Sequence, residues 1–230
     1  MAKTDRSDTI AESLVFGLAL AFSGGLMDAY SYLFRGGVFA NAQTGNILLF
    51  AVNLTRGEWI AALGFLTPVA AFSVGITISY LLKCRFPSGR SRRVFALAAE
   101  ILLFAVVAFV PQSQNNVANA LISLACGIQL EAFGVINANN VATTMCIGNL
   151  RCAIENLLAG CVKSERGALR KAGVYAAVIC AFAVGAAAGG GLIALVGSYA
   201  IIACAATVAV CLALVAFAPP GIIDGRRGAA

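Results

Sequence analysis

Long apolar runs separated by short polar loops cover the chain from about residue 11 to residue 217. The runs are continuous rather than alternating, which predicts membrane-spanning helices and argues against a β-barrel. Two of them, at about 38–54 and 141–162, are short and unusually polar, and the first barely reaches the length of a full span. The predicted segments lie at about 11–34, 38–54, 59–82, 94–110, 117–136, 141–162, 172–196 and 199–217.

The part of the chain that holds the first short polar run occurs twice. When the sequence is shifted by about 103 positions, Gly24–Gly57 falls on Gly127–Gly160. Acids and asparagines are scarce here and costly inside apolar runs, so their recurrence in register indicates an internal duplication. Chance similarity in a Gly-, Ala- and Leu-rich chain is the alternative. The matched polar positions are Asp28 with Glu131, Asn46 with Asn149, and Asn53 with Asn156.

The charged loops indicate how often the chain crosses the membrane. The basic loops at 83–93 and 163–171 are expected in the cytoplasm, whereas the uncharged loop at 111–116 is expected outside. If every segment crossed, the loops at 111–116 and 163–171 would lie on the same side, against this bias. The conflict disappears if the fifth and sixth segments together cross the membrane once. Because of the repeat, the first and second segments are expected to cross once together as well.

The predicted topology therefore has six crossings, with both termini in the cytoplasm. Each half crosses three times net, and an odd number inverts the second copy in the membrane. We predict an all-α, polytopic membrane helix bundle, a single domain over residues 1–230, with repeats at about 11–110 and 117–218. The short polar runs become half-helices or re-entrant segments, which are tolerated at that depth only where protein or a water-filled cavity covers them.

Composition narrows the classes of function. The chain is 60% hydrophobic and 11% charged, whereas a soluble domain carries about 25% charged residues. Its net charge of +6 sits in clusters between apolar runs and reads as a topology signal, not as a nucleic-acid surface. There is no histidine, and the eight cysteines lack close CxxC pairing, so neither a metal nor a cofactor is expected. The residues at 1–8 lead into a run too long for a signal peptide, which we interpret as a retained first helix.

Asp28 and Glu131 are acids inside apolar segments. A charge near the bilayer centre costs at least a few kcal/mol, so such a group pairs, becomes protonated or lines a polar cavity. We interpret the two acids as a cation or proton site, and the alternative is a structural pair with Arg35 or Arg151. Glu100 is a lone acid in its segment, for which pairing or snorkelling to the lipid interface is the simpler interpretation.

Amide side chains recur in the two short polar runs. Asn46 and Asn149 each follow a glycine, and at pseudo-symmetric positions they are suited to ring a constriction and replace the water around a solute. The alternative is that these asparagines form hydrogen bonds that hold helices together. Arg151 and Glu155 are four residues apart, which predicts an internal ion pair, with an anionic solute at Arg151 as the alternative. The candidate solute- or ion-binding residues are Asp28, Thr44, Asn46, Asn53, Gln129, Glu131, Asn149 and Asn156.

Several of these positions belong to a longer pattern: Gly24-Gly25-Leu26-Met27-Asp28-Ala29, Val38-Phe39-Ala40-Asn41-Ala42-Gln43-Thr44-Gly45-Asn46, Gly127-Ile128-Gln129, Ala132 and Thr143-Thr144. The pattern resembles the YoaK family of bacterial inner-membrane proteins, which are built around a domain of unknown function. The resemblance covers about residues 11–218 and implies a membrane protein of about six helices, without supplying a substrate. Ile147 departs from the pattern, because the family more often has threonine there, so no role that needs a hydroxyl is expected at that position.

These observations favour a small-solute transporter or channel of the cytoplasmic membrane, coupled to protons or another cation through its intramembrane acids. The expected partners are the lipid bilayer and a small solute or ion, and the small-residue run at 185–191 leaves room for a homo-oligomer. A membrane-embedded enzyme acting on a lipid-borne substrate is one alternative, but without histidine or a metal-ligand cluster we expect no enzymatic activity. A scaffold or sensor is the other, although it would not need acids at symmetric positions.

Overall fold

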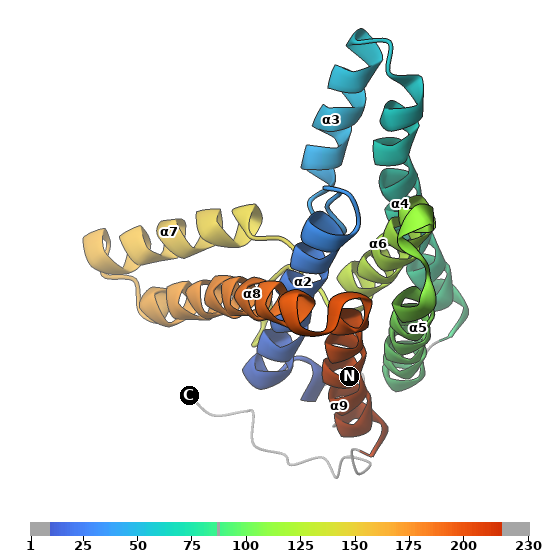
Figure 1. Ribbon diagram of the computed structural model, residues 1–230. Coiled ribbons are helices and arrows are strands. Elements are labelled where there is room, and N and C mark those ends of the chain that lie inside the picture. The colour runs from blue at the N-terminus through green and yellow to red at the C-terminus, as the bar shows by residue number, and fades with distance from the viewer. Residues whose placement is uncertain (1–9, 87, 218–230) are drawn as a thin grey trace.

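The chain folds as a bundle of helices with one short β-ladder (Figure 1). The computed structural model describes residues 10–86 and 88–217, and the predicted all-α membrane bundle is confirmed. The expectations for residues 1–8 and for the C-terminal tail lie outside the described residues. The elements are α2 (Leu14–Phe34), α3 (Gln43–Thr55), α4 (Trp59–Arg85), α5 (Gly89–Phe109), η1 (Gln112–Gln114), α6 (Asn115–Ala132), β1 (Val135–Ile136), β2 (Asn139–Asn140), α7 (Ile147–Val162), α8 (Ala168–Val196), η2 (Gly197–Ile201) and α9 (Ile202–Ala216).

Three stretches of the described chain are long and apolar enough to cross a membrane. They are α2, α4 and the stretch at 168–216 that joins α8, η2 and α9. Local signals set the helix ends: the Ser13 hydroxyl caps α2 by accepting the N–H of Phe16 at 3.3 Å. Beyond Phe34, Gly36 and Gly37 both have positive φ, which ends the helix because other residues resist that conformation.

The two short polar segments differ from the prediction in where their helices begin. The helix of the first starts at Gln43 rather than near residue 38, and that of the second at Ile147 rather than near residue 141. In addition, α6 ends at Ala132 rather than near residue 136. A hairpin follows it, with Asn137 and Ala138 both at positive φ in the tight turn that joins β1 to β2.

Glycines allow two pairs of helices to cross in close contact. A Cβ on Gly25 of α2 or on Gly185 of α8 would collide with the backbone of the other helix. The same holds at the second crossing for Gly75 of α4 and Gly127 of α6. Small residues at such crossings let membrane helices approach, and the small-residue run at 185–191 supplies one of them. At Gly185, this run packs against α2 of the same chain.

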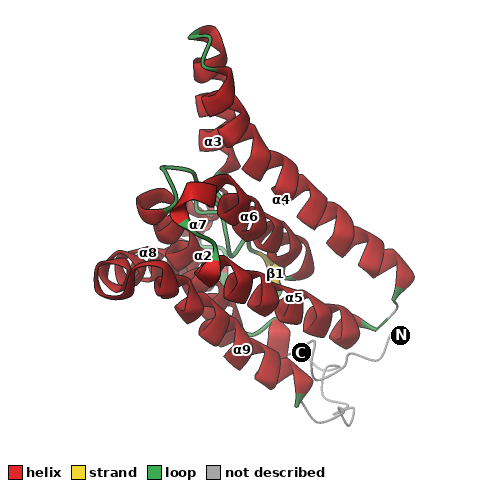
Figure 2. Ribbon diagram, turned by 45° about the vertical axis from the view of Figure 1, so that its right-hand side comes forward, coloured by secondary structure: helices red, strands yellow, loops and turns green. Residues whose placement is uncertain are grey.

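Two helical hairpins project from the bundle. One arm consists of α3 and the first half of α4, at the top of Figure 1, and the other of α7 and the first half of α8, at its left. The view in Figure 2 shows the first arm standing clear of the other helices. In the bundle itself, α4 packs on α6 as α8 packs on α2, and α5 packs on α9. The two halves of the chain therefore make corresponding contacts.

Candidate functional site

The irregular stretch between α2 and α3 folds back against the second half of α2. The carboxylate Oδ1 of Asp28 accepts the backbone N–H of Asn41 at 2.8 Å. The side-chain amide of Asn41 donates to the carbonyl of Gly24 at 3.1 Å. Ser31 Oγ accepts the N–H of Ala40 at 3.1 Å, so α2 supplies partners for the non-helical backbone. This arrangement satisfies polar backbone groups that would otherwise be costly inside an apolar bundle.

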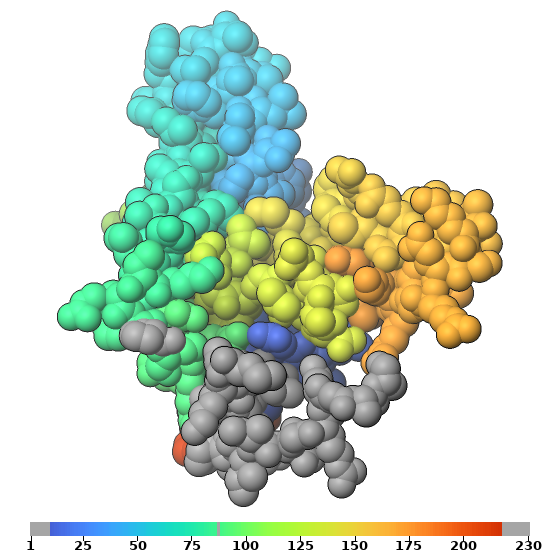
Figure 3. Space-filling model, turned by 180° about the vertical axis from the view of Figure 1, so that it is seen from behind, coloured from blue at the N-terminus to red at the C-terminus, as the bar shows by residue number. Residues whose placement is uncertain are grey.

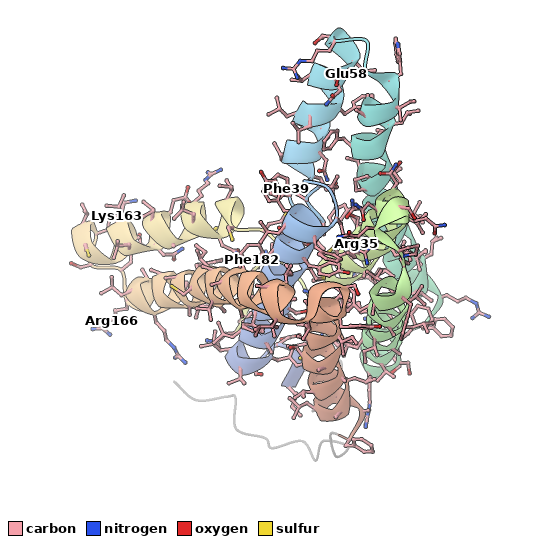
Figure 4. The ribbon with its side chains drawn as sticks, viewed as in Figure 1. Arg35, Phe39, Glu58, Lys163, Arg166 and Phe182 are labelled. Carbon is pink, nitrogen blue, oxygen red and sulfur yellow. The ribbon has the colours of Figure 1, made fainter. Side chains whose placement is uncertain are left out.

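The corresponding stretch of the second half, between α6 and α7, reaches the same part of α2. A Cβ on Gly24 would lie 3.1 Å from the carbonyl oxygen of Thr143 and 3.6 Å from the ring of Phe182. Figure 4 labels Phe182 on α8 and Phe39 near the base of α3. Thr143 in turn accepts a hydrogen bond from the amide of Gln129 at 3.0 Å. Gly24 is therefore the point at which the irregular stretches of both halves meet.

Three buried polar oxygens near this point have no hydrogen-bond partner within residues 10–86 and 88–217. They are Asn41 Oδ1, Gln129 Oε1 and Thr144 Oγ1. The three side chains are 1%, 0% and 2% exposed, respectively. Buried polar atoms are nearly always paired in proteins, and those that are not need a water, an ion or a function to account for them. We call these three residues, together with Asp28 and Thr143, the interior polar cluster.

The asparagines of the repeat make hydrogen bonds within their own segments. Asn46 clamps Phe39, accepting its N–H at 3.1 Å and donating to its carbonyl at 2.7 Å. Asn149 clamps Ala142 in the same way, at 3.3 Å and 2.7 Å. Each clamp spans seven residues and fixes the entry into a short helix. Both asparagine side chains thus form hydrogen bonds with the backbone of their own segment. The sequence had suggested either a constriction around a solute or hydrogen bonds between helices, and not this local use.

The remaining candidate residues lie apart from the interior polar cluster. Asn53 and Asn156 each donate to the carbonyl four residues earlier, at 2.7 Å and 2.8 Å. Thr44 is exposed. Glu131 pairs with Lys83 of α4 at 3.5 Å, whereas Asp28 is held by the backbone of Asn41, so the repeat-related acids occupy different environments.

Arg35 is a fully buried cation without an acidic partner in the described ranges. Its guanidinium donates to Tyr30 Oη at 2.7 Å and to the carbonyl of Val107 at 3.0 Å. A pair between Asp28 and Arg35, the structural alternative, is therefore not formed. Arg151 pairs with Glu155 at 2.7 Å on an exposed face of α7, as their spacing predicts.

Three polar residues have surroundings that the sequence did not predict: Glu100, which was expected to pair or to snorkel to the interface, and Asn41 and Thr144, which were not singled out. Glu100 of α5 is 0% exposed, and neither carboxylate oxygen has a hydrogen-bond partner in the described part of the chain. The sequence does mark Glu100, as an acid in the middle of an apolar run, but the repeat gives it no acidic counterpart in the second half. Asn41 and Thr144 carried a weaker signal: they are superposed by the same shift of about 103 positions, yet they differ in residue type.

Comparison with known proteins gives a family. The family described as "Protein of unknown function (DUF1275)" matches residues 16–215, which is most of the chain. This chain belongs to that family. It is also similar to the "UPF0700 transmembrane protein YoaK" of Bacillus subtilis (strain 168), with 26% identity over 178 residues, 73% of this chain and 78% of the relative. No solved structure matches the chain. The family resemblance expected from the sequence is therefore confirmed.

The side chains gathered at Gly24 are of types that bind small polar ligands. Within the described ranges, no group of three or more histidine, cysteine or acidic side chains is placed to hold a metal ion. The interior polar cluster instead offers one carboxylate, amide groups and hydroxyl groups from both halves of the chain. Oxygen atoms of this kind replace the water around an ion or a small polar solute.

Proposed function

We propose that the protein is a small-solute transporter or channel of the cytoplasmic membrane, with its path running through the interior polar cluster. The observation that carries the proposal is the meeting of two irregular stretches at Gly24, with buried polar oxygens that lack partners in the described residues beside them. Non-helical backbone is tolerated inside a membrane protein where it lines a cavity or a binding site. Transporters build solute sites in this way, from interrupted helices of two repeats.

We further propose that the two halves are inverted repeats with three net crossings each and both termini in the cytoplasm. Two observations support this proposal: the matching asparagine clamps at Asn46 and Asn149, and the corresponding contacts of α4 with α6 and of α8 with α2. The basic loops at 83–93 and 163–171 favour cytoplasmic positions. The bilayer and a small solute are the proposed partners, and a homo-oligomer remains compatible with the open surface at Gly191.

Asp28 is the residue that we propose couples transport to a proton or another cation. Asp28→Asn keeps an oxygen that accepts the N–H of Asn41 but removes the ionisable group. Purified protein in liposomes is screened by osmotic swelling in salts, sugars, polyols and amino acids, with and without a pH gradient. We expect saturable flux for at least one solute class and a loss of about tenfold or more in Asp28→Asn. Flux that is the same with and without the pH gradient, and the same in Asp28→Asn, would contradict coupling through Asp28.

Water access tests the path itself. In a cysteine-free background, Thr144→Cys places a thiol in the interior polar cluster, whereas Leu102→Cys places one on a side chain that is 65% exposed on the apolar surface of α5. A path that opens to water during transport predicts that a small, water-soluble thiol reagent modifies the first thiol and spares the lipid-facing one. Protection of Thr144→Cys under all conditions, in protein that is folded, would argue for a scaffold instead.

A further inference from the structure

A cavity of about 380 Å³ lies at the other end of α4, away from the arm. Its walls come from the end of α4, the start of α5, the end of α6, the β-hairpin and the segment before α2. Figure 3 shows the face on which these parts meet, with the green chain of α4 and α5 beside the lime hairpin. The volume lies within the range of about 300–1,000 Å³ that is usual for small-ligand sites.

Charged side chains converge on this cavity. Three cations, Lys83, Arg92 and Arg93, and two acids, Glu12 and Glu131, line it. Both acids are held loosely, each 3.5 Å from a cationic nitrogen, Glu131 from Lys83 and Glu12 from Arg93. Among the described residues that line the cavity, the cations therefore outnumber the acids by one.

Arg92 supplies this excess. Within residues 10–86 and 88–217 it has no acidic partner, and its Nη1 donates to the carbonyls of Phe86 and Lys83, at 3.2 Å and 3.5 Å. These contacts fix the guanidinium at the C-terminal end of α4 and leave its other N–H groups for a ligand. An arginine with a fixed plane is suited to bind two oxygens of one phosphate group.

The position along the chain favours a phosphate. Lys83 belongs to the last turn of α4, one of the stretches able to cross a membrane, so the cavity lies where a span ends. Phosphate groups of lipids occupy that level, and basic pockets between helix ends bind anionic head groups. The wall also includes apolar side chains, such as Leu130 and Phe133, which suit the glycerol and upper acyl part of a lipid.

We infer that this cavity is a binding site for an anionic phosphate group, with Arg92 and Lys83 as its donors. The site goes beyond the transport path, because the interior polar cluster takes no part in it. Glu131 pairs with Lys83 when no phosphate is bound, and it competes with the phosphate for Lys83 when phosphate binds. The phosphate comes from a lipid head group or from a soluble phosphate ester, and the two sources differ in a direct experiment.

Two substitutions that break the same ion pair test the inference. Lys83→Gln removes a donor, so affinity for the phosphate falls about tenfold, whereas Glu131→Gln removes a competitor, so affinity rises about threefold. A purely structural ion pair predicts the same loss from both. Arg92→Gln removes the second donor and should lower affinity as Lys83→Gln does. Lys163→Gln, in an exposed loop at the tip of the other arm, is the matched control and leaves binding unchanged.

The measurement uses the full purified chain in a neutral detergent. Native mass spectrometry counts bound phosphatidylglycerol against phosphatidylcholine, and thermal shift reports on inorganic phosphate and glycerol 3-phosphate. Saturable phosphatidylglycerol binding that follows the predicted order of variants supports a lipid source, and saturable glycerol 3-phosphate binding in that order supports a soluble source. Equal effects of Lys83→Gln and Glu131→Gln, an equal effect of Lys163→Gln, or no saturable binding of any probe would overturn the inference.

Discussion

Glu100 shows what a single buried acid costs this bundle. Its carboxyl is fully enclosed among α5, α6 and α9 without a hydrogen-bond partner in the described chain. Leaving a buried polar group unpaired costs about 1–3 kcal/mol, so Glu100→Met should raise the free energy of unfolding by about that amount. Glu100→Gln keeps an unpaired polar group and should bring no such gain. Thermal unfolding of both variants in one detergent measures the difference, and a loss of stability in Glu100→Met would mean that the carboxyl has a partner.

For Asn46 we predict that substitution lowers stability, because both polar groups of its side chain form hydrogen bonds. Asn46→Ala removes bonds to both backbone groups of Phe39 and to Gln43, and leaves the Phe39 backbone without those partners. We expect a loss of about 2–4 kcal/mol in unfolding free energy. Asn53→Ala, which removes one bond to a helix carbonyl, should lose no more than about 1 kcal/mol. Similar losses in the two variants would show that the clamp adds nothing beyond an ordinary hydrogen bond.

At the scale of elements, the crossing of α2 and α8 depends on backbone contact at Gly25. In Gly25→Ala the new methyl group meets backbone atoms, which cannot move aside as a side-chain end can. We expect a loss of about 2 kcal/mol or more, from overpacking. Gly191→Ala, on the same α8 but with no atom within 4 Å of the new carbon, should be neutral or gain about 0.5–1 kcal/mol from helix propensity. Melting temperatures that fall equally would exclude contact at the crossing as the cause.

Much of this arrangement could be predicted from the sequence, and the exceptions have a physical reason. Hydropathy located the helices, because it depends on the polarity of the side chains alone. The repeat superposed Asn46 on Asn149, and the structure gives them the same clamp. A pattern of residue types does not say which atom an amide meets, so the local use of these asparagines was missed. Nor does it say which face of a helix is buried, which is why Glu100 was assigned to pairing or to an interface.

At the scale of the whole molecule, the two arms distinguish an inverted duplication from a parallel one. Their tips carry Glu58 on one arm and Lys163 and Arg166 on the other (Figure 4). The proposed three net crossings in each half predict that the tips lie on opposite sides of the membrane, with the basic tip in the cytoplasm. A parallel duplication would place both tips on one side. The side from which each tip is reached therefore decides between the two.

Single cysteines in a cysteine-free background measure this directly, with a membrane-impermeant maleimide applied to intact cells and then to permeabilised ones. Glu58→Cys should react in intact cells, and Lys163→Cys only after permeabilisation. Ser113→Cys, in the uncharged loop, and Ser91→Cys, in the basic loop, are exposed controls for the outer and inner sides. Reaction of Glu58→Cys and Lys163→Cys from the same side would contradict the proposal that the two halves are inverted. A solute site shared by oppositely oriented halves would then lose its basis, because the irregular stretches would no longer enter the membrane from opposite leaflets to meet at Gly24.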